Sequence, residues 1–81
     1  MPTLLVVFGY RFYFFLNEHR PIHVHIKAKG GKAKIELEPD IRVVYNKGLK
    51  EQELSKAIEI CNLYKEEFIA AWYKRFGYGE N

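Results

Sequence analysis

Apolar and polar residues alternate most regularly along residues 21–39, which read Pro-Ile-His-Val-His-Ile-Lys-Ala-Lys, then Gly-Gly, then Lys-Ala-Lys-Ile-Glu-Leu-Glu-Pro. A period of two residues predicts β-strands with one apolar face and one polar face. The pair Gly30-Gly31 between the two runs predicts a tight turn, because glycine accepts the positive φ angles that such turns require. The stretch is therefore expected to form an antiparallel hairpin.

The polar face of this hairpin holds side chains that could take part in catalysis or ligand binding. With Gly30-Gly31 as the turn, His25 faces Glu36 and His23 faces Glu38. The same face carries four lysines, namely Lys27, Lys29, Lys32 and Lys34. In this pairing the face contains no aromatic side chain, so it lacks the stacking platform of an RNA-binding sheet.

A second hairpin is predicted upstream, from strands 3–8 and 11–16 joined by a type II′ turn at Gly9-Tyr10. Both of its faces are largely apolar. An antiparallel hairpin with one face in water should alternate more clearly. Either another part of the chain covers the second face, or that face is an interface. Residues 41–45 predict a further short strand.

The period changes to 3.6 residues from 50 to 76, which predicts an amphipathic helix. Its apolar stripe contains Leu54, Ala57, Ile58, Cys61, Tyr64, Phe68, Trp72 and Phe76. We expect one long helix, with Asn62 as the place for a kink. Such a helix spans roughly 40 Å, against about 17–20 Å for a strand. Its end would overhang the sheet, and Phe68, Trp72 and Phe76 would need cover from a second protomer or another protein, unless a break near Asn62 folds it back.

These patterns predict the α+β class, with an antiparallel sheet of four to five strands followed by one long C-terminal helix packed on the sheet. The 81 residues favour a single domain over 1–81, with a sheet part at 3–45 and a helical part at 50–76. One cysteine excludes an internal disulfide, and no secretory signal or membrane span is recognised, so we expect a cytoplasmic protein. The formal charge of +3 permits a nucleic-acid or acidic partner without requiring one.

The two histidines allow three interpretations. His23 and His25 lie at i and i+2 on one strand, so both point the same way and can serve as metal ligands, with Glu36 or Glu38 supplying an oxygen. The neighbouring lysines disfavour a divalent cation. Alternatively, the imidazoles are solvent-facing and simply paired with the glutamates across the strands.

The second interpretation is acid–base chemistry on RNA. His23, His25, Glu36 and Glu38 are then the catalytic candidates, because an imidazole titrates near neutral pH. The residues that would bind the phosphate backbone are Lys27, Lys29, Lys32, Lys34, Arg11 and Arg42. The third interpretation is a binding module without chemistry, in which the basic hairpin meets an acidic partner or nucleic acid and the aromatic hairpin meets another protein.

Several segments resemble a known family. They are the opening Met-Pro-Thr-Leu, the turn Phe-Gly-Tyr-Arg-Phe-Tyr-Phe-Phe, Asn17-Glu18, the signature Pro21-Ile-His-Val-His-Ile, Glu38-Pro39, Gly48-Leu49 and a late tryptophan. Together they resemble domain-of-unknown-function family 4160 over nearly the whole chain. Genes of that family often lie beside those of family 2442, so the resemblance implies a toxin–antitoxin-like pair. The expected partners are a small protein of family 2442 type or a second copy, and RNA; the alternative is a metal-binding protein.

Overall fold

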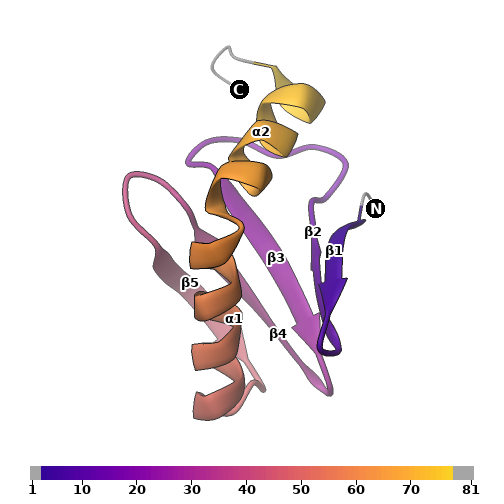
Figure 1. Ribbon diagram of the computed structural model, residues 1–81, viewed down its shortest axis with the longest axis vertical. Helices are drawn as coiled ribbons and strands as arrows, with labels where there is room; N and C mark the ends of the chain where they lie inside the picture. The colour runs from indigo at the N-terminus through magenta and orange to yellow at the C-terminus, as the bar shows by residue number, and fades with distance from the viewer. Residues whose placement is uncertain (1–2, 78–81) are drawn as a thin grey trace.

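The computed structural model describes residues 3–77 and shows five strands followed by two helices (Figure 1). The strands are β1 (Thr3–Val7), β2 (Tyr10–Tyr13), β3 (His23–Ala28), β4 (Gly31–Glu36) and β5 (Arg42–Lys47). The helices are α1 (Glu51–Leu63) and α2 (Lys65–Phe76). This arrangement confirms the α+β class, with an antiparallel sheet followed by C-terminal helices.

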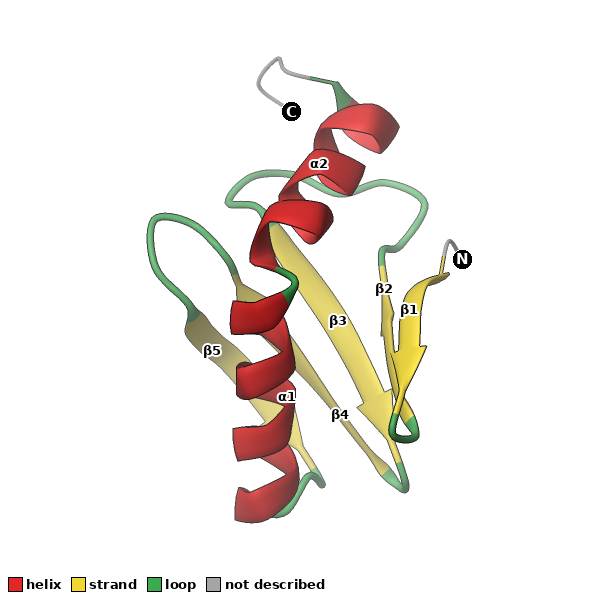
Figure 2. Cartoon of the chain, viewed as in Figure 1, coloured by secondary structure: helices red, strands yellow, loops and turns green. Residues whose placement is uncertain are grey.

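The strands lie in the sheet in the order in which they occur in the chain, and each is antiparallel to its neighbours. Both helices lie on the same side of the sheet (Figure 2). The sheet therefore has a helix-covered face and, on its other side, a face that we call the open face. β1 and β5 form the two edges.

The central hairpin turns one position earlier than the sequence predicts. Lys29 and Gly30 form the turn, and Ala28 pairs with Gly31, so the predicted register is wrong by two residues. Lys29 adopts the positive φ of 53°. Gly31 is needed elsewhere, because a Cβ there would lie 2.5 Å from the carbonyl carbon of Gly48. A shift of two residues leaves every side chain on its predicted face.

The first hairpin shows the same kind of difference. Its turn is Phe8-Gly9, with φ angles of 54° and 81°, and Val7 pairs with Tyr10. The prediction of Gly9-Tyr10 as the turn is therefore wrong, and the register again moves by two residues. Two positive φ angles in succession match a type I′ turn, whose twist suits an antiparallel hairpin.

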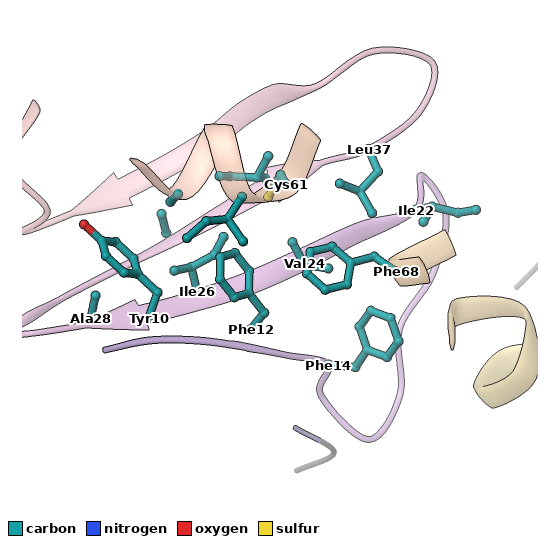
Figure 3. Close-up of a cluster of buried hydrophobic side chains, with 14 of the residues drawn as sticks. Tyr10, Phe12, Phe14, Ile22, Val24, Ile26, Ala28, Leu37, Cys61 and Phe68 are labelled. Atoms are coloured by element: carbon teal, nitrogen blue, oxygen red, sulfur yellow. The ribbon is translucent and has the colours of Figure 1, made fainter. Parts of the chain in front are cut away.

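The core lies between the sheet and the helices, where alternate residues of β2, β3 and β4 meet the apolar stripe of the helices (Figure 3). Phe12 of β2 stacks on Phe68 of α2 at 5.3 Å between ring centroids. Cys61 is fully buried among these side chains, and burial raises the pKa of its thiol to about 12. The fully buried members of the core include Phe12, Phe14, Ile22, Val24, Ile26, Ile35, Leu37, Cys61 and Trp72.

The predicted long helix is interrupted at Tyr64, two residues beyond the expected kink. α1 begins where the Glu53 carboxylate accepts a hydrogen bond from the Lys50 N–H at 2.8 Å, which is one half of a capping box. α2 continues past the ends of the strands and lies over the connection between β2 and β3 (Figure 1). Phe68 and Trp72 are buried there, at 3% and 0% exposure. Cover from a partner is expected only for an unbroken helix, so the interruption favours the alternative in which these two residues need no partner.

Between residues 3 and 77, no helix is both long and apolar enough to span a membrane.

Candidate metal centre

Two histidines of β3 and one glutamate from the preceding connection come together under the open face. His23 and His25 leave the strand on the same side, as the period of two requires. Glu18 lies in the segment between β2 and β3. All three are buried, with exposed fractions of 3%, 4% and 8% for His23, His25 and Glu18. The alternative in which both imidazoles face solvent is therefore wrong, although the two side chains point the same way as predicted.

A single carboxylate meets both rings. Oε1 of Glu18 lies 2.8 Å from Nε2 of His23, and Oε2 lies 2.9 Å from Nε2 of His25. The backbone N–H of Phe15 donates a hydrogen bond of 2.8 Å to Oε2 and so fixes the carboxylate. One ligand atom from each of the three residues can be chosen so that all lie within 4.8 Å of one another.

Aromatic rings enclose the cluster. Phe15 stacks on His25 with 3.9 Å between ring centroids, and Tyr13 lies 5.6 Å from the same imidazole. The rings of Trp72 of α2 and His23 meet in an edge-type arrangement, with 5.2 Å between ring centroids. These rings keep bulk water from the carboxylate and both imidazoles, which strengthens the electrostatic interactions among the polar groups.

The environment sets the charges of Glu18 and His25. Burial raises the pKa of Glu18, but the Phe15 N–H and the two imidazoles outweigh it and hold that pKa below its ordinary value. Burial lowers the pKa of His25, although the neighbouring carboxylate opposes this effect. At neutral pH the cluster therefore contains a carboxylate beside a neutral His25 ring.

His23 lies between two hydrogen-bond acceptors. Its Nδ1 is 2.7 Å from the carbonyl oxygen of Pro21, which can only accept a hydrogen bond, so Nδ1 carries a proton. Its Nε2 is 2.8 Å from an oxygen of Glu18, which also accepts. Nε2 therefore faces an acceptor, and a positively charged atom between Nε2 and the carboxylate would satisfy both.

The ring of His25 adds an unsatisfied group. Among residues 3–77, the buried side-chain nitrogens without a hydrogen-bond partner are Nδ1 and Nε2 of His25 and Nε1 of Trp72. Nε2 of His25 is close to Glu18 in distance, but the contact lacks hydrogen-bond geometry, so we count it as an electrostatic contact only. Buried polar atoms without partners cost about 1–3 kcal/mol each.

These donors are a ligand set that zinc accepts, since neutral imidazole nitrogen and carboxylate oxygen both bind Zn²⁺. The hydrogen bond from Nδ1 of His23 to the Pro21 carbonyl would orient Nε2 toward the ion, as outer-shell partners commonly do. Ligands at about 2.0–2.1 Å in a tetrahedron are roughly 3.3 Å apart. The carboxylate would therefore retreat slightly from the imidazoles, which lie 2.8 and 2.9 Å away.

The predicted glutamate partners lie elsewhere. In the observed register His23 is opposite Glu36 and His25 is opposite Lys34, so the predicted pairs His25–Glu36 and His23–Glu38 are wrong. Glu36 instead forms an ion pair with Arg42, at 3.1 Å. Glu38 lines a cavity of about 650 Å³ together with Arg20, Pro21, Ile22, Pro39 and Lys65.

The predicted phosphate-binding residues largely share the open face. Arg11 pairs with Lys27, and Lys27 pairs with Lys32, so these three lie side by side on adjacent strands. Lys34 and Arg42 belong to the same face. Lys29 does not join them, because it lies in the turn with its Nζ 3.9 Å from Glu53 of α1.

The sequence interpretation missed Glu18. It is the one acidic residue between β2 and β3, and it precedes His23 and His25 by five and seven positions. Its place in a polar connection gave no periodic signal, because only the path of that connection brings it under β3. The pair Asn17-Glu18, among the segments that carry the family resemblance, was the available indication.

Comparison with known proteins gives one match. The family model for Domain of unknown function (DUF4160) covers residues 9–73. That range includes all three residues of the candidate metal centre. Searches of curated proteins and of solved structures gave no significant match. Because the family model covers most of the chain, this protein belongs to the DUF4160 family.

Proposed function

We propose that the protein binds one transition-metal ion, with zinc the best fit, through Nε2 of His23, Nε2 of His25 and the carboxylate of Glu18. The observation that carries the proposal is that one buried carboxylate faces the Nε2 atoms of two imidazoles. The other nitrogen of His23, Nδ1, already donates a hydrogen bond to the Pro21 carbonyl oxygen. A cation placed between the carboxylate and the imidazoles satisfies Nε2 of both rings and leaves Nδ1 of His25 as the imidazole nitrogen without a partner.

The ion has a structural role in this proposal. It ties the connection between β2 and β3, through Glu18, to β3 itself. Acid–base chemistry on RNA is less well supported, because His23 and His25 are 3% and 4% exposed. A phosphodiester group would need contact with an imidazole nitrogen, within about 2.6–3.2 Å, to exchange a proton with it.

Metal analysis tests the proposal directly. Protein stripped with a chelator, reloaded with zinc and desalted should retain one equivalent by mass spectrometry. The His25→Gln variant should retain less than a tenth of that amount. His19→Gln is the matched control, since His19 is exposed and lies outside the cluster. Absence of stoichiometric metal in the unaltered protein, or equal retention by His25→Gln, overturns the proposal.

A second candidate function is strand pairing between two copies of the chain. β1 is an edge strand without a charged residue, and Val6 of β1 and Phe8 of the following turn are 64% and 75% exposed. The other edge, β5, carries Arg42 and Lys47, which would repel a second copy. Backbone groups of an unprotected edge readily accept another strand. A homodimer through β1 is compatible with the toxin–antitoxin-like pair, whose other member would then meet the dimer.

Sedimentation velocity tests this candidate. We expect a dimer that Val6→Lys dissociates by placing like charges across the interface. Val44→Lys is the matched control, because Val44 lies on the β5 edge at 38% exposure. A monomer at every concentration, or a dimer that responds only to Val44→Lys, rejects the β1 interface. The homodimer is also rejected if the protein stays monomeric alone and associates only with a family 2442 partner.

A further inference from the structure

Four cationic residues form a straight row across the open face. The pairing of adjacent strands places Arg11 of β2 opposite Lys27 of β3, Lys27 opposite Lys32 of β4, and Lys32 opposite Lys47 of β5. Directly opposed residues of antiparallel strands lie on the same face. Lys27, Lys32 and Lys47 are exposed and Arg11 is half-buried. We call these four residues the basic row.

The basic row is unfavourable for the fold alone. Neighbouring strands are about 4.7–4.9 Å apart, so the four Cα positions span roughly 14 Å. Like charges directly opposite each other destabilise a sheet. Local arrangements that work against stability occur mainly where a protein has a function to perform. An anionic ligand would turn this repulsion into attraction.

The positive charge of the molecule is concentrated on this face. Lys34 and Arg42 accompany the basic row, and Glu36 is the acidic residue paired among them. Six cations and the carboxylates of Glu36 and the buried Glu18 give this face a net charge of +4, whereas the whole chain carries only +3. The remainder of the chain is therefore net negative, so an anion is attracted to one side of the protein.

Aromatic groups lie beside the basic row. The next row of paired positions runs Tyr13, His25, Lys34, Tyr45, which corrects the expectation that the polar face lacks aromatic residues. Phe15 stacks on His25 and remains 41% exposed. Its outer ring face is thus available to a planar group, whereas Tyr13 is buried at 6% exposure. The half-buried Tyr45 lies at the other end of this row.

We propose that the open face binds single-stranded nucleic acid, with phosphates along the basic row and a base against Phe15. Combining a cationic track with an exposed aromatic ring is how proteins hold single strands without reading sequence. An acidic peptide would satisfy the charges but would leave the ring unused. The four cations lie outside the candidate centre, whereas the Phe15 ring stacks on His25, so binding is measured both without and with zinc.

The test is fluorescence anisotropy with a labelled 12-nucleotide RNA of mixed sequence, using the chelator-treated full chain and, in parallel, the zinc-loaded one. With about four phosphates contacted, log K should fall with log salt at a slope near −2.8, which is about a 50-fold loss of affinity from 50 to 200 mM salt. Lys32→Gln, in the middle of the row, should make the slope shallower by about 0.7. Phe15→Ala should weaken binding at all salt concentrations.

Lys74→Gln is the matched control, because Lys74 is exposed on α2. The substitution removes the same charge as Lys32→Gln, but from the helical side of the protein. It should leave the salt slope unchanged. The inference is overturned if no binding occurs at 50 mM salt, or if Lys32→Gln and Lys74→Gln have equal effects. It is also overturned if polyglutamate, duplex of the same sequence or anionic vesicles compete as well as the single strand does.

Discussion

Replacing Glu18 with alanine should be the most damaging single change in the candidate metal centre. The variant loses the 2.8 Å contact with His23, the 2.9 Å contact with His25 and the acceptor of the Phe15 N–H. All of these groups are enclosed by aromatic rings, so water does not readily replace the carboxylate.

The magnitude follows from those contacts. An unsatisfied buried N–H costs about 1–3 kcal/mol, and removing one partner of a buried ion pair costs about 3–5 kcal/mol. Because these losses share one carboxylate, they do not add, and we expect the free energy of unfolding to fall by about 3–5 kcal/mol. A chain of this length has roughly 4–12 kcal/mol in total, so Glu18→Ala should be barely folded. Glu18→Gln retains an acceptor for Phe15 and should lose less.

The assay is urea unfolding followed by circular dichroism at pH 7, with a chelator present so that metal does not contribute. Glu59→Ala is the control, since the side chains of Glu59 and its partner Lys56 are 62% and 40% exposed and such surface pairs contribute about 0–1 kcal/mol. If Glu18→Ala loses no more stability than Glu59→Ala, the buried cluster does not stabilise the fold and our account of it is wrong.

Other changes test separate parts of the structure. Because burial lowers the pKa of His25 below 6.5 in the folded state, the unfolded chain binds that proton first, so stability should fall as pH drops below about 6.5, and His25→Gln should flatten this part of a pH–stability curve. Lys32→Gln should raise the free energy of unfolding by about 0.4–2 kcal/mol at 10 mM salt by relieving two repulsions, and an equal gain at 1 M salt would contradict a charge effect. Gly31→Ala should lower the urea midpoint, because its Cβ would meet backbone at 2.5 Å, whereas Gly30→Ala meets nothing within 4 Å; equal midpoints would refute the close approach. Cys61, with its pKa raised to about 12, should react with a thiol reagent only at the rate of unfolding, and fast labelling of native protein would show that it is accessible.

The faces of the strands could be predicted from the sequence, but their pairing could not. The period of two placed the histidines and lysines on one side, and that result survived a register error of two residues. The error came from assigning the turn to Gly30-Gly31, whereas Gly31 is required because its backbone lies too close to Gly48 for a side chain to fit. The sequence alone could not show this requirement, because the two segments meet only in the folded chain. The basic row exists only in the true register.

The helical part shows a similar division. The stripe of apolar residues gave its extent and its buried side, yet no glycine or proline marked the interruption at Tyr64. Glu18 is the larger omission, since the histidines were recognised while the carboxylate that contacts them was assigned to a polar connection. The period of two in a strand predicts which side chains share a face, whereas the position of a loop side chain depends on the path of the loop in the folded chain.

The contact between Trp72 and His23 links α2 to the central strand of the sheet. Ribosomes deliver the chain from its first residue to its last, so β3 emerges well before the ring that shields it. During synthesis the imidazole of His23 therefore stays open to the surrounding water until α2 has emerged. A metal ion bound at that stage would be enclosed only once α2 has packed against β3.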